Sequence, residues 1–223
     1  IATIIAVIIG IIALVSYLKV KNKTKYDKTV ELFPPDNLNS LDLSSWNTAK
    51  VTDMSWMFAS CRSMNELNIN GWDTSKVTDM SNMFGGCNSL SSLNVKELET
   101  NSVTKMNSMF ADCISLKKLD VSGFNTTKVK NISGMFYGCE GLTSLDLSDF
   151  DTSEVTDMSK MFMNCEKLTG LDVSNFDTTK VTDMSYMFFG CEGLTSLDLS
   201  DFDTSEVTDM TYMFLNCKNM TSL

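Results

Sequence analysis

Hydrophobic positions in this chain recur at a fixed interval of 26 residues, and the polar positions between them keep the same interval. The first unit covers residues 51–76, and each later unit begins at the valine 26 residues further on, starting with Val77. Cysteine marks every unit once and occurs nowhere else: Cys61, Cys87, Cys113, Cys139, Cys165, Cys191 and Cys217. A strict period of this length is typical of stacked structural units, so the pattern predicts a solenoid of seven repeats, the last one incomplete.

Within each unit the pattern changes from one period to another. The apolar residues between Met83 and Leu90 lie at helical spacing, which predicts a short helix, and Asp79 or Ser81 could cap its first turn. Each unit is therefore expected to contain a short helix on one side of a shared core.

The other half of the unit predicts a strand and a turn. Leu145 and Leu147 flank Asp146, an alternation that suits a short strand with two inward side chains. The Asp-Thr-Ser stretch at 151–153 favours a turn, because Asp and Ser side chains bond nearby backbone amides. The predicted fold class is α/β: a right-handed β/α leucine-rich-repeat solenoid with 26-residue coils, preceded by one long apolar N-terminal α-helix.

The cysteine column has three possible uses. Stacked neighbours would be close enough for disulfides, but an odd number of thiols leaves one over. The chain has no C-x-x-C pair and no histidine, so the spacing of a zinc site is missing. A ladder of buried, reduced thiols is the preferred interpretation, since free cysteine is among the most buried residue types. The sixteen methionines fall mostly in apolar columns and are interpreted as core filling.

Aspartates also form columns, and these leave a metal site open. Asp151, Asp177 and Asp203 would stack at the turn, where carboxylate oxygens could hold calcium. The alternative is that these side chains cap turns and that the aspartates of the strand column face water. We favour the capping interpretation and predict no cofactor.

The repeats resemble the BspA-like leucine-rich repeats of microbial cell-surface proteins. The resemblance covers about residues 38–223 and rests on VTDMSYMFFGC at 181–191 and LTSLDLSDFDTSEVTDM at 142–158. It implies a right-handed β/α solenoid that serves adhesion or binding without catalysis. The unit at 77–102 departs from the pattern, because Leu98 and Glu99 replace the usual Phe-Asp pair.

The start of the chain has a different pattern. Residues 1–18 carry no charge, and as a helix they would extend about 27 Å, close to the thickness of a bilayer core. We expect residues 1–33 to form this helix and a lysine-rich junction, and residues 34–50 to form a Pro-Pro linker and a half-coil cap before the repeats of 51–223. The helix residues expected to anchor or assemble the protein are Ile1, Ile4, Ile5, Ile8, Ile11, Ile12 and Val15.

The lysines follow the apolar run instead of preceding it, which is unusual for an anchor that exports its C-terminal domain. Three explanations remain open: a basic leader absent from this sequence, a cytoplasmic solenoid, or cleavage just before the apolar run. The last resembles the processing of type IV pilins, although Ile5 stands where many bacterial pilins carry a glutamate. We favour a pilin-like filament subunit that binds copies of itself through this helix, with a single-span membrane-anchored adhesin as the alternative.

Charge and composition exclude several functions. The chain has a net charge of −10, and the lysines near its start leave the repeats more acidic still, so nucleic acid is not an expected partner. Without histidine, the commonest general base is missing, and no unique pocket of catalytic residues is indicated. The sequence therefore predicts a non-enzymatic, extracellular cell-surface protein that binds an unidentified protein or glycan.

Overall fold

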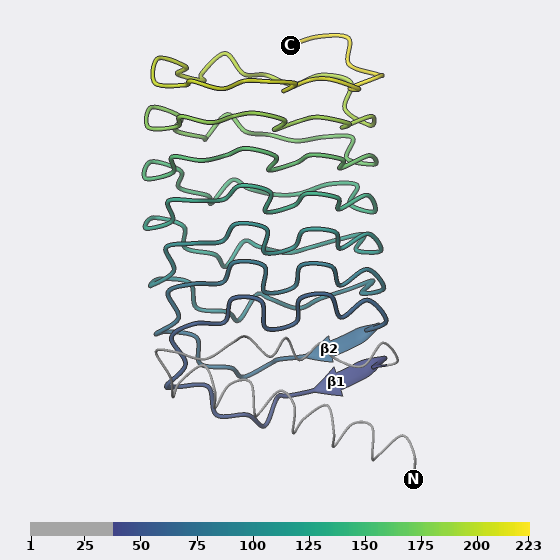
Figure 1. Ribbon diagram of the computed structural model, residues 1–223, viewed down its shortest axis with the longest axis vertical. Helices are drawn as coiled ribbons and strands as arrows, with labels where there is room; N and C mark the ends of the chain where they lie inside the picture. Colours follow the sequence, from purple (N-terminus) through teal and green to yellow (C-terminus); the bar gives the residue numbers. More distant parts are fainter. Residues whose placement is uncertain (1–37) are drawn as a thin grey trace, which may run out of the picture.

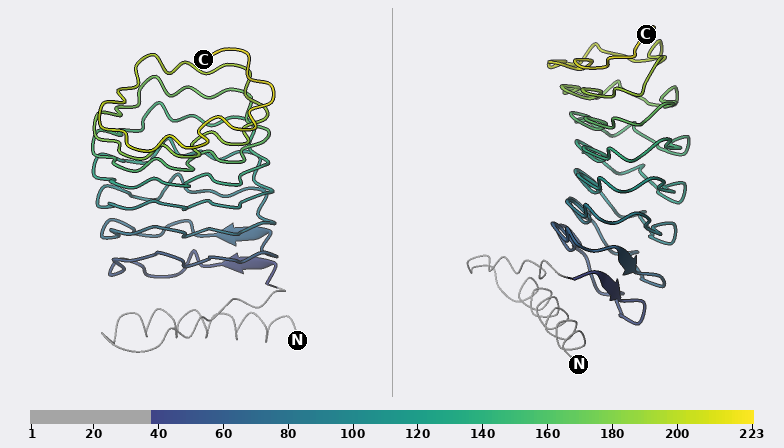
Figure 2. Two further views of the ribbon diagram at one scale, coloured as in Figure 1. Left: turned by 45° about the horizontal axis from the view of Figure 1, so that its top comes forward. Right: turned by 90° about the vertical axis from the view of Figure 1, so that its right-hand side faces the viewer.

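The computed structural model describes residues 38–223, which form a single stack of coils (Figure 1). The views in Figure 2 agree that each coil lies over the one before it. Strand β1 (Ser40–Asp42) pairs in parallel with β2 (Glu66–Asn68), and Leu41 lies opposite Leu67. The pairing joins residues one repeat apart, so the segment before Val51 is stacked on the first full unit.

In later coils the strand is reduced to isolated bridges. Ser144 bridges Gly170, and a second row of bridges joins Asp53 to Asp79 and continues at the same position to Asp209. The predicted alternation at 145–147 is nevertheless present, because both leucines are buried and the aspartate between them is exposed. Side-chain packing therefore maintains the in-out pattern where a regular strand is absent.

The predicted short helix is wrong, because the structure has no helix within residues 38–223 and forms successive turns instead. The amides of Asn82 and Phe84 donate to the carbonyls of Asn107 and Met109 in the next coil, each at 2.9 Å. An α-helix directs its amides to carbonyls four residues earlier, so an amide that pairs with the next coil is lost to a helix. Asn82 and Gly86 also adopt left-handed φ values of 54° and 76°, which a right-handed helix does not contain.

The remaining amides of this segment close turns within their own coil. Met83 donates to Met80, and Cys87 donates to Phe84, each three residues earlier. Alternate amides therefore hold the coil in shape and bind it to its neighbour. Residues 38–223 accordingly contain no helix long and apolar enough to cross a membrane.

A column of stacked phenylalanine rings runs through the core. Adjacent centroids are 5.6–5.9 Å apart and the ring planes differ by 4–10° along Phe58, Phe84, Phe110, Phe136, Phe162, Phe188 and Phe214. Thirteen of the sixteen methionines are buried around this column. Like side chains thus contact like side chains from coil to coil, which is why one inner pattern serves every repeat.

A second column, made of threonines, holds the turn side of the stack together. Thr126 is 2% exposed, and its hydroxyl donates to the carbonyl of Asp151 at 2.8 Å while accepting from the amide of that residue at 2.8 Å. Thr152 and Thr178 make the same donation to the coil that follows them. These hydroxyls supply partners to backbone groups that lie partly buried between the coils.

Candidate interaction surface

The cysteine column lies inside the stack. All seven cysteines are free thiols; six are buried and Cys217 is half-buried. Each described thiol from Cys87 onward donates to the carbonyl of a phenylalanine 29 residues earlier, as Cys139 does to Phe110 at 3.1 Å. Burial raises the pKa of Cys113 to about 12 and holds that of Cys139 well above its usual range. A thiol with so high a pKa is a poor nucleophile and a poor metal ligand, so this column serves packing.

The turn aspartates considered as calcium ligands accept hydrogen bonds within their own turns. The carboxylate of Asp151 accepts from the amide of Ser153 at 2.9 Å and from its hydroxyl at 2.6 Å. Asp177 and Asp203 accept from the amide two residues later in the same way. These hydrogen bonds lower the pKa of all three carboxyls. Among residues 38–223 no group of three or more acidic, cysteine or histidine side chains is arranged to hold a metal ion.

The aspartates of the strand column also accept hydrogen bonds from the residue two positions later. Asp146 accepts from the amide and hydroxyl of Ser148, and the hydroxyl bond is the largest cause of its lowered pKa. Asp120, Asp172 and Asp198 are exposed and have their pKa lowered by the serine two residues later. This face presents a regular row of solvated carboxylates.

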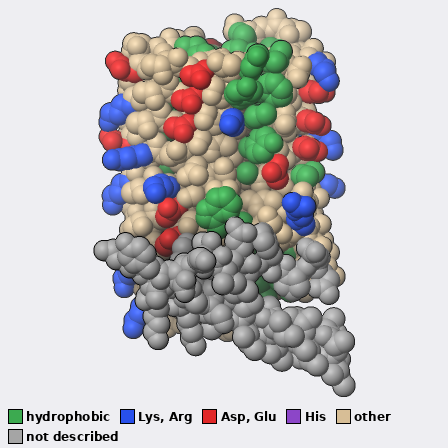
Figure 3. All heavy atoms as spheres, viewed as in Figure 1, with side chains coloured by type: hydrophobic (Ala, Val, Ile, Leu, Met, Phe, Trp, Pro, Cys, Tyr) green, Lys and Arg blue, Asp and Glu red, His purple; other side chains and the backbone are tan. Residues whose placement is uncertain are grey.

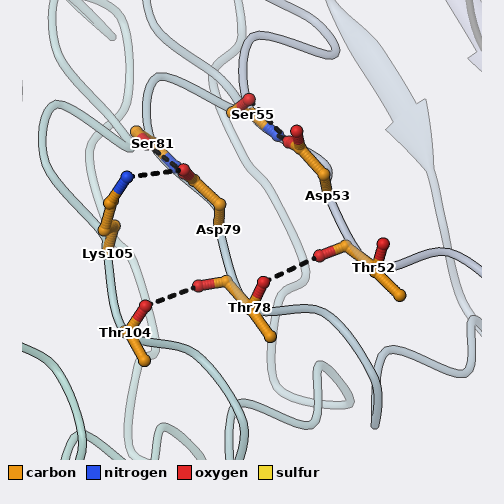
Figure 4. A network of polar contacts seen from close by, with 8 residues as sticks. All are labelled: Thr52, Asp53, Ser55, Thr78, Asp79, Ser81, Thr104 and Lys105. Atoms are coloured by element: carbon orange, nitrogen blue, oxygen red, sulfur yellow. Dashed lines mark hydrogen bonds and ion pairs between the residues drawn. The ribbon is translucent and has the colours of Figure 1, made fainter. Parts of the chain in front are cut away.

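A network of polar contacts lines the side of the first coils (Figure 4). The hydroxyl of Thr78 donates to the carbonyl of Thr52 at 3.2 Å, and Thr104 repeats the contact to Thr78 at 3.1 Å. Beside this row the ammonium of Lys105 lies 3.4 Å from the carboxylate of Asp79. The contacts bind one coil to the next, so the network is a structural seam and not a pocket.

The surface that varies most between coils is formed by outward side chains of the segment at 82–87 and its counterparts, where turns replace the predicted helix. Two of them, at the sixth and ninth positions of the unit, are Asn82 and Gly85 in one coil but Tyr186 and Phe189 in another. The latter two rings are 5.7 Å apart and both are partly exposed. Figure 3 shows a band of hydrophobic side chains along one face of the molecule. Solvent-exposed aromatic side chains in contact with one another are a feature of binding surfaces.

Comparison with known proteins identifies the family of the repeats and a solved structure with a similar fold. The chain matches a family described as "Mycoplasma protein of unknown function, DUF285" over residues 18–92, 66–145 and 140–222. The chain belongs to the DUF285 family. It is also similar to a leucine-rich repeat protein from Bacteroides ovatus ATCC 8483, with a TM-score of 0.56 and 20% identity, over 89% of this chain and 50% of that one. No curated protein matches the chain.

The likeness to the Bacteroides protein shows the fold alone, and the DUF285 chain spans about half of the length of that protein. Together the two findings confirm the predicted BspA-like leucine-rich repeats. They do not extend to the resemblance between residues 1–18 and pilins. The predicted assembly positions, from Ile1 to Val15, lie outside the described residues.

The inner columns of this DUF285 chain could be placed from the sequence, but the aromatic residues at the sixth and ninth positions of the unit were missed. Tyr186 and Tyr212 lie at a position that the helical interpretation treated as part of a short helix. A signal was present, because other repeats have Asn82 or Gly134 at the same position and so show that an aromatic ring is not needed there. Comparing the repeats column by column would have found this surface.

Proposed function

We propose that this protein is a non-enzymatic surface protein whose solenoid is displayed outside the cell as an interaction module. The observation that carries the proposal is the contrast between columns. The inner phenylalanine column is the same residue in all seven repeats, whereas the outward position two residues before it holds Trp56, Asn82, Ser108, Gly134, Lys160, Tyr186 and Tyr212. Repeats that share a core and differ on their exterior present one scaffold with different contact surfaces, as binding solenoids do.

The chemistry of the described residues supports a binding role over a catalytic one. Burial raises the pKa of the Cys139 and Cys165 thiols, and the aspartate columns at the turn and on the strand accept hydrogen bonds from their own turns. Catalytic groups need an accessible atom with a pKa matched to the reaction, and these groups are used to hold the backbone.

The display proposal is tested on intact cells with a membrane-impermeant amine reagent. The lysines of the repeats are exposed, as Lys160 and Lys180 illustrate, so a displayed solenoid is expected to be labelled before the cells are lysed. A cytoplasmic protein of the same cells is the control. Labelling that requires lysis would contradict the proposal.

We further propose that the protein assembles into a filament through residues 1–18. This segment has no charged residue, so as a helix it needs an apolar environment, which copies of itself would supply. The alternative is a single-span anchor surrounded by lipid.

The segment contains no cysteine, so an Ile8→Cys variant introduces one thiol there. Bismaleimide cross-linking on intact cells should give a ladder of multimers if the helices pack together, with the unmodified chain as control. Monomers and dimers alone would favour the anchor. Mass spectrometry that finds an uncleaved leader on the mature protein would also count against the pilin-like version.

A further inference from the structure

Large outward side chains, most of them aromatic, follow one another along the last four coils in a row that we call the aromatic stripe. Its members occupy the sixth and ninth positions of the unit: Tyr137, Met163, Tyr186, Phe189, Tyr212 and Leu215. Tyr212 and Leu215 are exposed, and the other four are half-buried. The ring of Tyr186 lies 5.3 Å from that of Tyr212 and 5.7 Å from that of Phe189, so the stripe crosses from one coil to the next.

The backbone under the stripe is in a conformation that does not suit aromatic residues. Tyr186 and Tyr212 have φ values of 59° and 56°, in the left-handed region. This conformation is strained for most residues with a Cβ, less so for asparagine and not for glycine. Gly134 and Asn82 occupy the same position of the unit with φ values of 58° and 54°. Trp56, Ser108 and Lys160 adopt the same conformation in their own coils, so the fold accepts side chains of any size here and does not require a tyrosine.

Negative charge is concentrated in the same half of the stack. Residues 129–223 contain sixteen carboxylates and five lysines, a net charge of −11. Residues 38–128 contain nine carboxylates and eight basic residues, a net charge of −1. The acidic half is thus the half that carries the stripe.

Within that half, acidic residues flank the stripe on both sides. Asp183 precedes Tyr186 by three residues, and Glu192 follows Phe189 by three. Figure 3 shows acidic side chains on either side of the hydrophobic band. These flanking columns are the third and twelfth positions of the unit, and in the last four coils they hold six carboxylates and one lysine. That lysine, Lys218, pairs with Glu192 at 2.6 Å. A cation already lies on the stripe, since the ammonium of Lys160 is 5.9 Å from the centre of the Tyr186 ring.

We propose that the aromatic stripe binds a segment of another polypeptide that is rich in lysine or arginine. Cationic side chains would lie over the tyrosine faces, with their aliphatic stems along Phe189 and Leu215 and their charges between the acidic columns. Charge complementarity favours such a partner, whereas a nucleic acid or an anionic lipid surface would be repelled. This inference rests on the proposed role as an interaction module and names the class of partner.

The test uses the full chain in detergent micelles and a fluorescent twelve-residue peptide of alternating Lys and Ser, with a Gln-Ser peptide as the neutral control. We expect the Lys-Ser peptide to bind and the Gln-Ser peptide not to bind. The double variant Tyr186→Asn/Tyr212→Asn should weaken binding at least about tenfold, the sum expected for two cation–π contacts at a partly exposed site. Its melting temperature should stay the same or rise, because Asn82 occupies the same backbone conformation in its own coil.

Trp56 supplies a matched control. It occupies the same position in the first coil with a φ of 62°, is 59% exposed, and is followed at the flanking position by Arg62 instead of an acid. A Trp56→Asn variant should bind the peptide as the unmodified chain does.

Three results would overturn the proposal: equal binding by the double tyrosine variant, equal loss in Trp56→Asn, or equal binding of the Gln-Ser peptide, which would point to a neutral ligand. Sedimentation of the same samples tests whether the cations come from a second copy of this chain. Self-association that the tyrosine variant abolishes would assign the stripe to the lysines at 19–28 of a second copy, and so overturn a foreign partner. The binding assay is independent of location, so its failure with intact surface labelling would reject only the inference about the stripe.

Discussion

Replacing a phenylalanine in the middle of the ring column should destabilise the stack far more than replacing one at its end. Phe136 is 0% exposed, and its ring lies 5.9 Å from both Phe110 and Phe162. Truncating a buried phenylalanine to alanine costs about 3–5 kcal/mol, and each ring contact contributes about 0.5–1.5 kcal/mol of such a loss. With two stacked neighbours and no solvent contact, Phe136→Ala should lower the free energy of unfolding by about 4–5 kcal/mol.

Phe214 is the matched control, because within the described residues it is only partly buried and has one stacked neighbour, Phe188 at 5.7 Å. Phe214→Ala should cost about 2 kcal/mol, the value of partial side-chain burial with one ring contact. Urea unfolding followed by circular dichroism, in the same detergent for every sample, measures both losses. A gap in the middle of the column also interrupts coupling on two sides, so the Phe136→Ala transition should be broader. Equal losses in the two variants would refute the argument that stacked rings carry the stability of the repeat.

Four other outcomes are expected. Thr126→Val, which leaves the amide and carbonyl of Asp151 without their hydroxyl partner, should cost about 1–3 kcal/mol in urea unfolding, whereas exposed Thr156→Val should cost little. Iodoacetamide at pH 8 should modify only half-buried Cys217 in the native protein and all seven thiols in denaturant, as counted by mass spectrometry. Because the pKa of Asp146 and its column is lowered on folding, their contribution to stability is complete above about pH 4 and is lost as the pH falls through the lowered values, which acid unfolding curves will show. Millimolar calcium should leave the melting temperature unchanged, since the Asp151 column is engaged by its own turns; a rise would restore the metal site.

The period of the sequence was sufficient to predict the stack. Columns of Phe, Met and Cys at one interval can be buried together only if equal coils lie over one another, and the rings do so within 5.6–5.9 Å. The turn at 151–153 was also predictable, because the aspartate and serine that form it are adjacent in sequence and bond each other locally. Features decided within one coil, or repeated in every coil, are therefore accessible from the sequence.

The predicted helix failed because hydrophobic spacing reports which side chains face the core and says nothing of where the amides point. Met83, Phe84 and Cys87 are all buried, as a helical stripe would require. Their segment is nevertheless held by hydrogen bonds to the next coil, and the chain turns through left-handed residues to make them. Neither property has a hydrophobic signature, so a helix and a run of turns give the same pattern.

The left-handed positions explain why the aromatic stripe was hidden and how it could be found. A tyrosine in one repeat has no special meaning by itself, and Tyr186 fits a helix as well as a turn. Once the repeats are aligned, the same left-handed position holds residues as different as Gly134, Lys160 and Tyr186. The fold therefore does not require the tyrosines, and they occur where negative charge is concentrated. In a repeat protein the neighbouring units supply the comparison that identifies such positions, because every unit has the same fold and only the exterior is free to differ.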